Sequence, residues 1–257
     1  MLLLENMPEL QDQLSTRDLQ FLIRIYNNGL EKYKSHIIRL GLEHSTKVLD
    51  AGSGFGQWSF AFAELNSTNS VTAIDISGER ISVSNTLCSL YPELQVHFEV
   101  ASLESIPYPD NHFDCAFSFS SIYYVDVEKA LRELTRVVCP GGKIYICTNA
   151  IGWYVYNLVC APNATPDFRP RLYGLRTIGE SILSKMSGRI YLPRTSTVTS
   201  KSYLRHLLRR QGIPASHIQL GLEGTLSQDS NTVSPSPLLR QKYMCLDSCI
   251  ECLFTKP

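Results

Sequence analysis

Residues 47–56 read Lys-Val-Leu-Asp-Ala-Gly-Ser-Gly-Phe-Gly, a short apolar run that leads into Asp50 and three alternating glycines. This order predicts a strand, a tight turn and the start of a helix whose free N–H groups face a ligand. Glycine at positions 52, 54 and 56 removes the Cβ atoms that would keep a ligand away from the main chain. The run therefore predicts a site for a nucleotide-like ligand.

The composition is that of a soluble globular protein, with 257 residues, 44% hydrophobic and 19% charged. Its formal net charge is zero, which gives no overall case for nucleic acid as a partner. The start, Met-Leu-Leu-Leu-Glu, has no basic leader and only three leucines before an acid, so we expect neither a signal peptide nor a membrane span. We expect a cytoplasmic protein whose eight cysteines are reduced.

The cysteine pattern favours ordinary thiols over a metal site. Cys115 and Cys147 lie in apolar strand-like runs and are expected in the core. Cys249 and Cys252, with Cys245 nearby, have a metal-like spacing. However, a strand turns residues three apart to opposite faces, and no second pair accompanies them, so we expect no bound metal.

Hydrophobic periodicity predicts strands that alternate with helices up to residue 149. Residues 16–41 carry apolar positions at helical spacing and predict one or two helices before the first strand. The predicted strands are 48–49, 71–76, 95–100, 114–119 and 143–148, the predicted helices are 57–65, 78–90 and 128–138, and Pro140-Gly141-Gly142 is the predicted turn into the fifth strand. Such alternation predicts right-handed crossovers and a parallel sheet.

The character of the chain changes after residue 149. Residues 150–200 lack a strand pattern and are expected to form a lid inserted after strand five, with a helix over 171–186. Further predicted elements are a helix over 201–211, strands over 217–220 and 248–255, and a surface loop over 221–237. We therefore expect one α/β domain over 1–257, with N-terminal helices (1–44), a ligand-binding core (45–149), the lid (150–200) and a C-terminal helix and strands (201–257).

Polar residues at the predicted strand ends narrow the choice of ligand. Open parallel sheets bind ligands beyond the carboxyl ends of their strands, where Asp50, Asp75, Ser102 and Ser118 fall. Asp75 is placed to accept hydrogen bonds from both hydroxyls of a ribose, and Ile76 would pack on a flat base. A helix N-cap or turn is the alternative role for Asp75.

A dinucleotide matches this pattern poorly. The fingerprint Gly-x-Gly-x-x-Gly, counted from Gly52 and Gly54, requires a third glycine where Gln57 stands. Asp50 directly before the loop would repel a pyrophosphate, whereas it suits a ligand that carries an ammonium or sulfonium group.

Four stretches, in order and spacing, make residues 45–149 resemble the class I S-adenosylmethionine-dependent methyltransferases of the small-molecule type. They are Val-Leu-Asp-Ala-Gly-Ser-Gly-Phe-Gly (48–56), Val-Thr-Ala-Ile-Asp (71–75), Ser-Ile-Pro-Tyr-Pro-Asp-Asn-His-Phe-Asp (105–114) and Ala-Leu-Arg-Glu-Leu-Thr-Arg-Val-Val-Cys-Pro-Gly-Gly-Lys (130–143). The resemblance implies a Rossmann-like, doubly wound, mostly parallel seven-stranded sheet with helices on both faces. It also implies S-adenosylmethionine as the cofactor.

The resemblance assigns roles to individual residues of the cofactor site. Asp50 and the loop would hold the methionine portion, Asp75 the ribose, and Ile76 and Leu103 the adenine. At position 102 the family often has an acid, and Ser102 stands there instead. The full set of expected cofactor-binding residues is Asp50, Gly52, Ser53, Gly54, Gly56, Asp75, Ile76, Ser102, Leu103 and Ser118.

The acceptor side is less distinct in the sequence. Methyl transfer from a sulfonium requires alignment and exclusion of water more than a strong base. Relatives often carry a Glu-His pair after strand four, and Tyr123 and Tyr124 stand at those positions here. Tyr124 is the candidate catalytic residue, although tyrosine is a poor base near neutral pH. The candidate substrate-binding residues are Tyr26, Tyr33, Tyr123, Trp153 and Tyr154. A packed aromatic cluster is the alternative for them.

Charge suggests one hypothesis about the acceptor. Residues 165–210 hold ten Lys or Arg against two acids, a local charge balance of +8. This excess favours a small-molecule acceptor that bears carboxylate or phosphate, such as a glycan or natural-product intermediate. We expect methylation on oxygen or nitrogen. Solvated helix faces are the alternative. Amino-methylating DNA and glutamine enzymes carry the signature Asn/Asp-Pro-Pro-Tyr/Phe after strand four, where this sequence has Ser118-Phe119-Ser120-Ser121. Nucleic acid and protein are therefore less supported as acceptors. A non-catalytic S-adenosylmethionine-binding regulatory protein and an NAD-dependent oxidoreductase are the alternatives from other classes.

Overall fold

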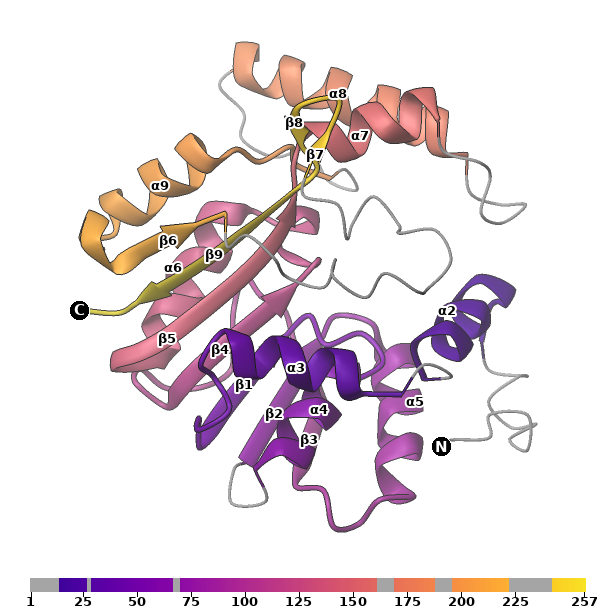
Figure 1. Cartoon of the computed structure of the whole chain (residues 1–257), viewed down its shortest axis with the longest axis vertical. Coiled ribbons are helices and arrows are strands. Elements are labelled where there is room, and N and C mark those ends of the chain that lie inside the picture. Colours follow the sequence, from indigo (N-terminus) through magenta and orange to yellow (C-terminus); the bar gives the residue numbers. More distant parts are fainter. Residues whose placement is uncertain (1–13, 27–28, 67–69, 161–168, 188–195, 222–241) are drawn as a thin grey trace.

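The fold is built on one seven-stranded sheet (Figure 1). The computed structural model describes residues 14–26, 29–66, 70–160, 169–187, 196–221 and 242–257. The strands lie in the order β3-β2-β1-β4-β5-β9-β6, and β9 alone runs antiparallel to its neighbours. Their bounds are β1 Lys47–Ala51, β2 Ser70–Asp75, β3 Val96–Val100, β4 Phe113–Phe119, β5 Val138–Asn149, β6 Ile218–Leu220 and β9 Cys249–Thr255. The predicted mostly parallel, seven-stranded sheet is confirmed.

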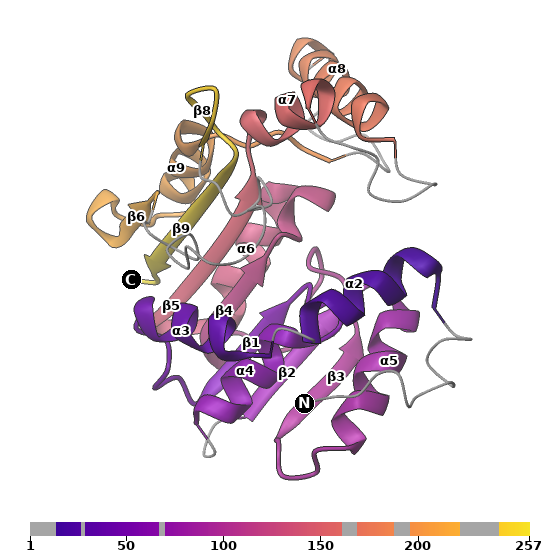
Figure 2. The same cartoon turned by 45° about the vertical axis from the view of Figure 1, so that its right-hand side comes forward.

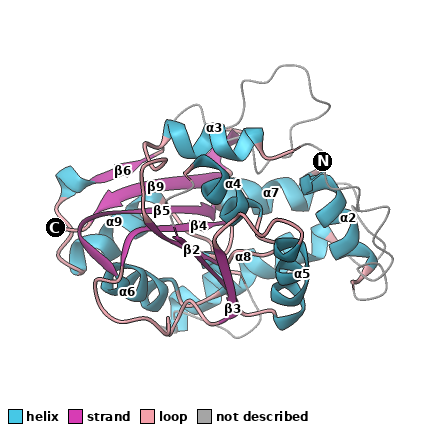
Figure 3. Ribbon diagram, turned by 90° about the horizontal axis from the view of Figure 1, so that it is seen from below, coloured by secondary structure: helices cyan, strands magenta, loops and turns pink. Residues whose placement is uncertain are grey.

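Helices cover both faces of the sheet (Figures 2 and 3). One face packs against α2 (Thr16–Tyr26), α3 (Glu31–Arg39), α4 (Gln57–Leu65) and α5 (Gly78–Ser89), and the other against α6 (Val127–Val137) and α9 (Lys201–Arg210). Helix α6 shows why: Val127, Leu131 and Leu134 repeat at helical spacing and are buried, while Asp126 caps its first turn. The expected doubly wound, Rossmann-like arrangement is confirmed.

A helical cap follows β5 and lies beyond the carboxyl ends of β4 and β5 (Figures 1 and 2). It consists of α7 (Ile151–Val159), α8 (Pro170–Ser187) and a hairpin of β7 (Lys242–Tyr243) and β8 (Leu246–Asp247). Ala150 bridges Thr199, and the Thr199 hydroxyl donates to the carbonyl of Asn149 at 2.7 Å, so the segment leaves and rejoins the sheet at one point. None of the helices in the described residues is long and apolar enough to cross a bilayer.

Strand β5 begins earlier than predicted. It starts at Val138, so Pro140-Gly141-Gly142 lies within the strand and the prediction of a turn before it was wrong. The reason is the chain's end: Gly141 N–H donates to the carbonyl of Lys256, and Lys256 N–H donates to the carbonyl of Gly142. These bonds tie the segment to the end of the chain, and Gly141, with a φ of 79°, lies where the register against β4 shifts between Phe113 and Cys115.

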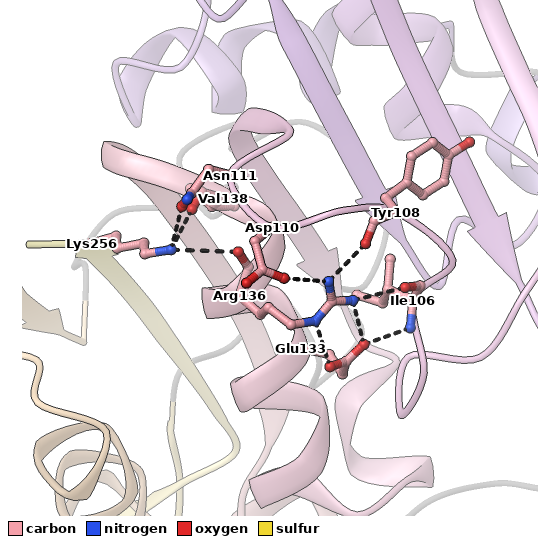
Figure 4. Close-up of polar contacts among 8 residues, drawn as sticks. All are labelled: Ile106, Tyr108, Asp110, Asn111, Glu133, Arg136, Val138 and Lys256. Carbon is pink, nitrogen blue, oxygen red and sulfur yellow. Dashed lines mark hydrogen bonds and ion pairs between the residues drawn. The ribbon is translucent and has the colours of Figure 1, made fainter.

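One arginine joins helix α6 to the segment that precedes β4 (Figure 4). Arg136 on α6 donates to the carbonyls of Ile106 and Tyr108 and to the carboxylates of Asp110 and Glu133, at 2.7–2.9 Å. These residues belong to two of the four stretches that carry the family resemblance, which gives those stretches a structural role.

Cysteines lie where the sequence predicted. Cys115 and Cys147 are buried, in agreement with their expected place in the core. Cys249 packs in the cluster on the α2–α5 face and Cys252 in the cluster on the α6 and α9 face, so the two point to opposite sides of β9. Residues 222–237 of the predicted surface loop lie outside the described part of the chain.

Candidate cofactor and acceptor site

The site lies where the strand order reverses. From β1 the chain proceeds outward to β2 and β3, then returns to the other side of β1 as β4. The loops after β1 and β4 therefore diverge at the carboxyl edge, which is the ligand-binding position of open α/β sheets. The first of them is the glycine loop, Gly52–Gly56, and the second begins with Ser120 and Ser121, directly after Ser118 and Phe119 at the end of β4.

The amides of the glycine loop point inward rather than toward a ligand. The N–H groups of Gly52 and Ser53 both donate to the carbonyl of Ile74, at 2.8 and 2.9 Å. The N–H of Gly54 donates to Asp75 Oδ2 at 2.9 Å. These three turn amides are therefore not free to bind a pyrophosphate. That the free N–H groups at the start of α4 face a ligand stays a prediction.

Two of the three glycines are required by packing. All three have positive φ, between 59° and 82°. A Cβ on Gly52 would lie 2.3 Å from Ser121 Cβ, and one on Gly56 would lie 2.6 Å from the Phe98 ring. At Gly54 it would meet open space. At Gly52 and Gly56 the neighbours that exclude a Cβ belong to the protein, and a role of the three glycines in making room for a ligand stays a prediction.

Asp50 is a buried acid without a positive partner. Its side chain is 1% exposed, and its Oδ2 accepts a hydrogen bond of 2.6 Å from Ser59 Oγ. Within the described residues no Lys, Arg or His nitrogen forms an ion pair with it. Burial raises its pKa to about 7, the Ser59 hydroxyl lowers it in part, and nearby Asp75 raises it. A cation brought beside Asp50 would offset this burial of charge.

Asp75 closes β2 and supports two turns. Its Oδ1 accepts from the N–H of Ser77, and its Oδ2 accepts from the N–H of Gly54, both at 2.9 Å. The N-cap of α5 is Ser77 rather than Asp75. Each carboxylate oxygen has a second lone pair, so the turn role leaves capacity for ribose hydroxyls.

The remaining candidate cofactor residues surround these two acids. Ile76 is 73% exposed next to Asp75, whereas Leu103 is buried. The Ser102 hydroxyl accepts from the N–H of Glu104, and the Ser118 hydroxyl lies 2.7 Å from that of Ser121. The hydroxyl of Ser53, in the loop itself, is buried and has no hydrogen-bond partner among the described residues.

The site fits S-adenosylmethionine better than a dinucleotide. A carboxylate without a counter-cation suits the ammonium or sulfonium of the methionine end, and inward-facing amides do not suit a phosphate. Asp75, with spare acceptor capacity beside an exposed Ile76, suits an adenosine. Within the part of the chain that the structure describes, no group of three or more His, Cys, Asp or Glu could hold a metal ion.

The structure brings three of the candidate acceptor residues together and places the other three elsewhere. Tyr123 and Tyr124 lie in a 3₁₀ turn after β4 with ring centroids 4.4 Å apart; Tyr123 is buried and Tyr124 is 54% exposed. Burial raises the pKa of Tyr123 well above its usual value, and the neighbouring Tyr124, Tyr173 and Tyr154 raise it further. Tyr154, on α7, therefore lies close to Tyr123, and we call Tyr123, Tyr124 and Tyr154 the tyrosine cluster.

The other candidates lie apart from this tyrosine cluster. Tyr26 is buried and its hydroxyl donates to the carbonyl of Phe55 at 2.6 Å, so it supports the glycine loop. Tyr33 is buried with its ring 4.8 Å from that of Trp58. Trp153 stacks on Tyr156 of the same helix, with centroids 6.2 Å apart. The packed-aromatic alternative describes the surroundings of these three.

Four further residues belong to the site and were not predicted. Ser59 bonds Asp50, and Ser121 packs on Gly52; both contacts depend on tertiary packing and leave no local signal. Asn149 ends β5, and its Oδ1 is buried without a hydrogen-bond partner among the described residues. The Tyr154 hydroxyl lies beside the side chains of Asn149 and Tyr173. The strand-end rule that selected Asp75 would also have selected Asn149. Tyr173, on α8, completes the cluster, with its ring 5.8 Å from that of Tyr154.

The basic segment faces solvent where it is described. Arg169, Arg171 and Arg176 are exposed, and Arg176 pairs with Glu180 at 2.7 Å. Lys201 pairs with Asp247 and Arg210 with Glu128. The solvated-face alternative describes these side chains.

Comparison with known proteins agrees with the fold. Residues 49–146 match the family model described as "Methyltransferase domain". The chain is 31% identical over 145 residues to the ubiquinone/menaquinone biosynthesis C-methyltransferase UbiE of Pseudomonas fluorescens, covering 52% of this chain and 56% of that protein. It is 36% identical over 123 residues to phosphoethanolamine N-methyltransferase 3 of Arabidopsis thaliana, covering 48% and 25% respectively.

A solved structure extends the similarity of fold to nearly the whole chain. It is a complex of the Haloferax volcanii Trm112 methyltransferase activator with a methyltransferase, which matches with a TM-score of 0.61 and 17% identity over 96% of this chain and 97% of that one. The matched part spans about half the length of UbiE and a quarter of the plant enzyme. Residues 49–146 therefore match a methyltransferase domain, a family whose methyl donor is S-adenosylmethionine.

Proposed function

We propose that this protein transfers a methyl group from S-adenosylmethionine to a small-molecule acceptor. The observation that carries the proposal is Asp50, a buried acid that has no cationic partner among the described residues and lies beside a glycine loop whose first three amides face inward. Two matched relatives support the acceptor class, since their names give ubiquinone or menaquinone biosynthesis and phosphoethanolamine as their context.

The chain's own residues have defined tasks in this proposal. Asp50 holds the cationic methionine end, Asp75 accepts hydrogen bonds from the ribose, and Ile76 and Leu103 flank the adenine. Ser53 has a buried hydroxyl that lacks a partner among the described residues, and this hydroxyl is available to hydrogen-bond the bound S-adenosylmethionine. The bound donor supplies an activated methyl group, so the protein contributes alignment and exclusion of water.

The tyrosine cluster is the proposed acceptor side. Tyr124 is its exposed member, and Asn149 offers a buried amide oxygen without a partner among the described residues, next to the buried Tyr154 hydroxyl. Buried polar groups in this state suit an acceptor with a hydroxyl or amino group, methylated on oxygen or nitrogen. The segment 150–200 acts as the lid over this group. The exposed arginines of α8 give no support to the anionic acceptor suggested by the sequence.

The test is release of S-adenosylhomocysteine from S-adenosylmethionine in the presence of a panel of small phenols, alcohols and amines. Asp75→Ala should weaken cofactor binding by about 1–3 kcal/mol, because a charged hydrogen-bond acceptor is lost. Glu93→Ala, an exposed acid outside the site, is the matched control. Donor binding without turnover of any acceptor would favour the non-catalytic alternative, and unchanged affinity in the Asp75 variant would contradict the ribose assignment.

A further inference from the structure

Helix α8 shows its apolar residues to solvent. The exposed fractions of Leu172, Leu175, Ile182 and Leu183 are 57%, 59%, 54% and 61%. Twelve large hydrophobic side chains are exposed in the described residues, and four of them lie on this one helix. Scattered exposed leucines are ordinary on a protein surface, but a cluster on one element marks an interaction site.

The face that α8 packs against the protein carries small and polar residues beside Tyr173. Gly174 lies so close to α7 that an added Cβ would be 2.6 Å from the carbonyl oxygen of Tyr154. Thr177, one turn further along, is buried. The usual arrangement of a surface helix, with its apolar stripe inward, is therefore reversed in α8.

Basic side chains border the apolar stripe. At about 100° of rotation per residue, Leu172, Leu175, Ile182 and Leu183 fall on one side of the helix. By the same rotation, Arg171 falls at one edge of the stripe and Arg176 at the other, and both side chains are exposed. Arg169, directly before the helix, is exposed as well, and Arg176 also pairs with Glu180. The outer face is thus an apolar stripe with a cationic rim.

We propose that α8 is a membrane-docking helix, which lies in the interface of an anionic lipid bilayer. An amphipathic helix of this kind inserts its apolar face to the level of the acyl-chain boundary, while arginines at the rim contact lipid phosphates. Each cationic residue near an anionic surface adds to binding. Docking through α8 places the cap, with Tyr154 of the tyrosine cluster on its helix α7, next to the lipid.

The same surface suits a second copy of the chain less well. Four partly exposed side chains provide a patch on the order of a few hundred Å², whereas a stable interface buries about 800 Å² per partner. A symmetric contact would also bring the arginine rims of two copies together. An anionic lipid surface has the opposite charge and needs no such area.

The test is co-sedimentation of the full chain with vesicles of phosphatidylcholine alone and of phosphatidylcholine with 30% phosphatidylglycerol. The wild type should bind the anionic vesicles, and salt should weaken this binding. Leu172→Gln/Leu175→Gln/Ile182→Gln/Leu183→Gln should lower the partition coefficient more than about tenfold. Arg169→Gln/Arg171→Gln/Arg176→Gln should lower it about 10- to 100-fold.

Matched controls separate docking from changes of fold or net charge. Ile38→Gln/Leu90→Gln removes exposed apolar side chains from other helices, and Arg205→Gln/Arg209→Gln/Arg210→Gln removes the same charge from α9. Both controls should bind vesicles within about twofold of the wild type. Circular dichroism and binding of S-adenosylhomocysteine confirm that each variant is folded.

Several outcomes would overturn the proposal. One is absence of wild-type binding to the anionic vesicles, and another is equal loss of binding in the controls. A dimer in light scattering that dissociates in the four-residue variant would show that the stripe binds a second copy. A large loss of thermal stability in that variant would show that the stripe is covered by this chain itself. Vesicle binding requires neither the methyl donor nor turnover, so its failure would leave the proposed reaction unaffected.

Discussion

Asp50 is the residue at which pH acts on the site. Its carboxyl group is buried beside Ser59 and Asp75, without a cationic partner among the described residues, and burial raises its pKa to about 7. Only the ionised form attracts a cationic ligand. Because the group is half protonated near neutral pH, affinity for the donor depends on pH in a range where an ordinary aspartate would not titrate.

We predict that S-adenosylhomocysteine and S-adenosylmethionine bind about fivefold more tightly at pH 7 than at pH 6, since the ionised fraction of a group with pKa near 7 rises from about a tenth to a half. Isothermal titration calorimetry at the two values measures this. Asp50→Asn should bind weakly with no such pH dependence. An equally steep profile in that variant would show that another group is responsible.

The glycine loop shows what the sequence tells about single residues and what it omits. Its position and its turn were predictable from the apolar run and the alternating glycines. The reason for Gly52 was not, because Ser121, which would clash with its Cβ, is 69 residues away along the chain. Asn149 could have been found, since it ends a predicted strand, whereas Ser59 becomes visible only when α4 packs over β1.

At the scale of elements, Arg136 joins helix α6 to the segment before β4 (Figure 4). It bonds two carbonyls and two carboxylates through its planar guanidinium, and the Glu133 carboxylate also accepts from the N–H of Ile106 at 2.8 Å. The hydrogen bonds to Glu133 and Asp110 raise the pKa of Arg136, and the same arginine lowers the pKa of Glu133. A lysine has neither the fork nor the reach to keep all four partners.

We predict that Arg136→Lys lowers the free energy of unfolding by about 2 kcal/mol, because several charge-assisted hydrogen bonds are lost from a side chain that is only partly screened by solvent. Urea unfolding measures this. Arg132→Lys, an exposed arginine on the same helix, is the control and should stay within about 0.5 kcal/mol of the wild type. Equal stability of both variants would contradict the role of Arg136.

The elements of the core were predictable because strands and helices differ in period. Helix α4 was predicted with its observed bounds. For the other core elements, most predicted ends lie within one or two residues of the observed ends. Helix α7 was missed because its sequence, Ile-Gly-Trp-Tyr-Val-Tyr-Asn-Leu-Val, is apolar and aromatic around its whole circumference and shows no period. The start of β5 was missed because its partner is the far end of the chain.

At the scale of the molecule, a buried polar chain joins the N-terminal helices to the last strand. His36 on α3 lies 3.1 Å from the Tyr145 hydroxyl on β5, which donates to Glu251 on β9 at 2.7 Å. Arg39 lies 3.0 Å from the other ring nitrogen of His36. Burial and, to a lesser degree, the Arg39 charge lower the pKa of His36 to about 3. The imidazole is therefore neutral in the folded protein.

We predict that this histidine makes folding sensitive to acid. Its folded pKa lies below the unfolded value of about 6.5, so its contribution is complete above pH 6.5 and falls as pH decreases toward 3, by at most about 1.4 kcal/mol per pH unit. Asp50, whose folded pKa is raised, acts in the opposite direction between about pH 4 and 7. The comparison is therefore between the wild type and His36→Gln, by urea unfolding at pH 7, 6 and 5. The stability difference between them should shrink as pH falls; parallel curves would contradict a neutral buried His36.

The central claim is that the carboxyl edge of this sheet binds S-adenosylmethionine rather than a dinucleotide. The most direct measurement is calorimetric titration of the protein with S-adenosylhomocysteine and, separately, with NAD. We expect one S-adenosylhomocysteine bound per chain, affinity reduced in Asp75→Ala and unchanged in Glu93→Ala, and no heat from NAD. Binding of NAD without S-adenosylhomocysteine would contradict the account.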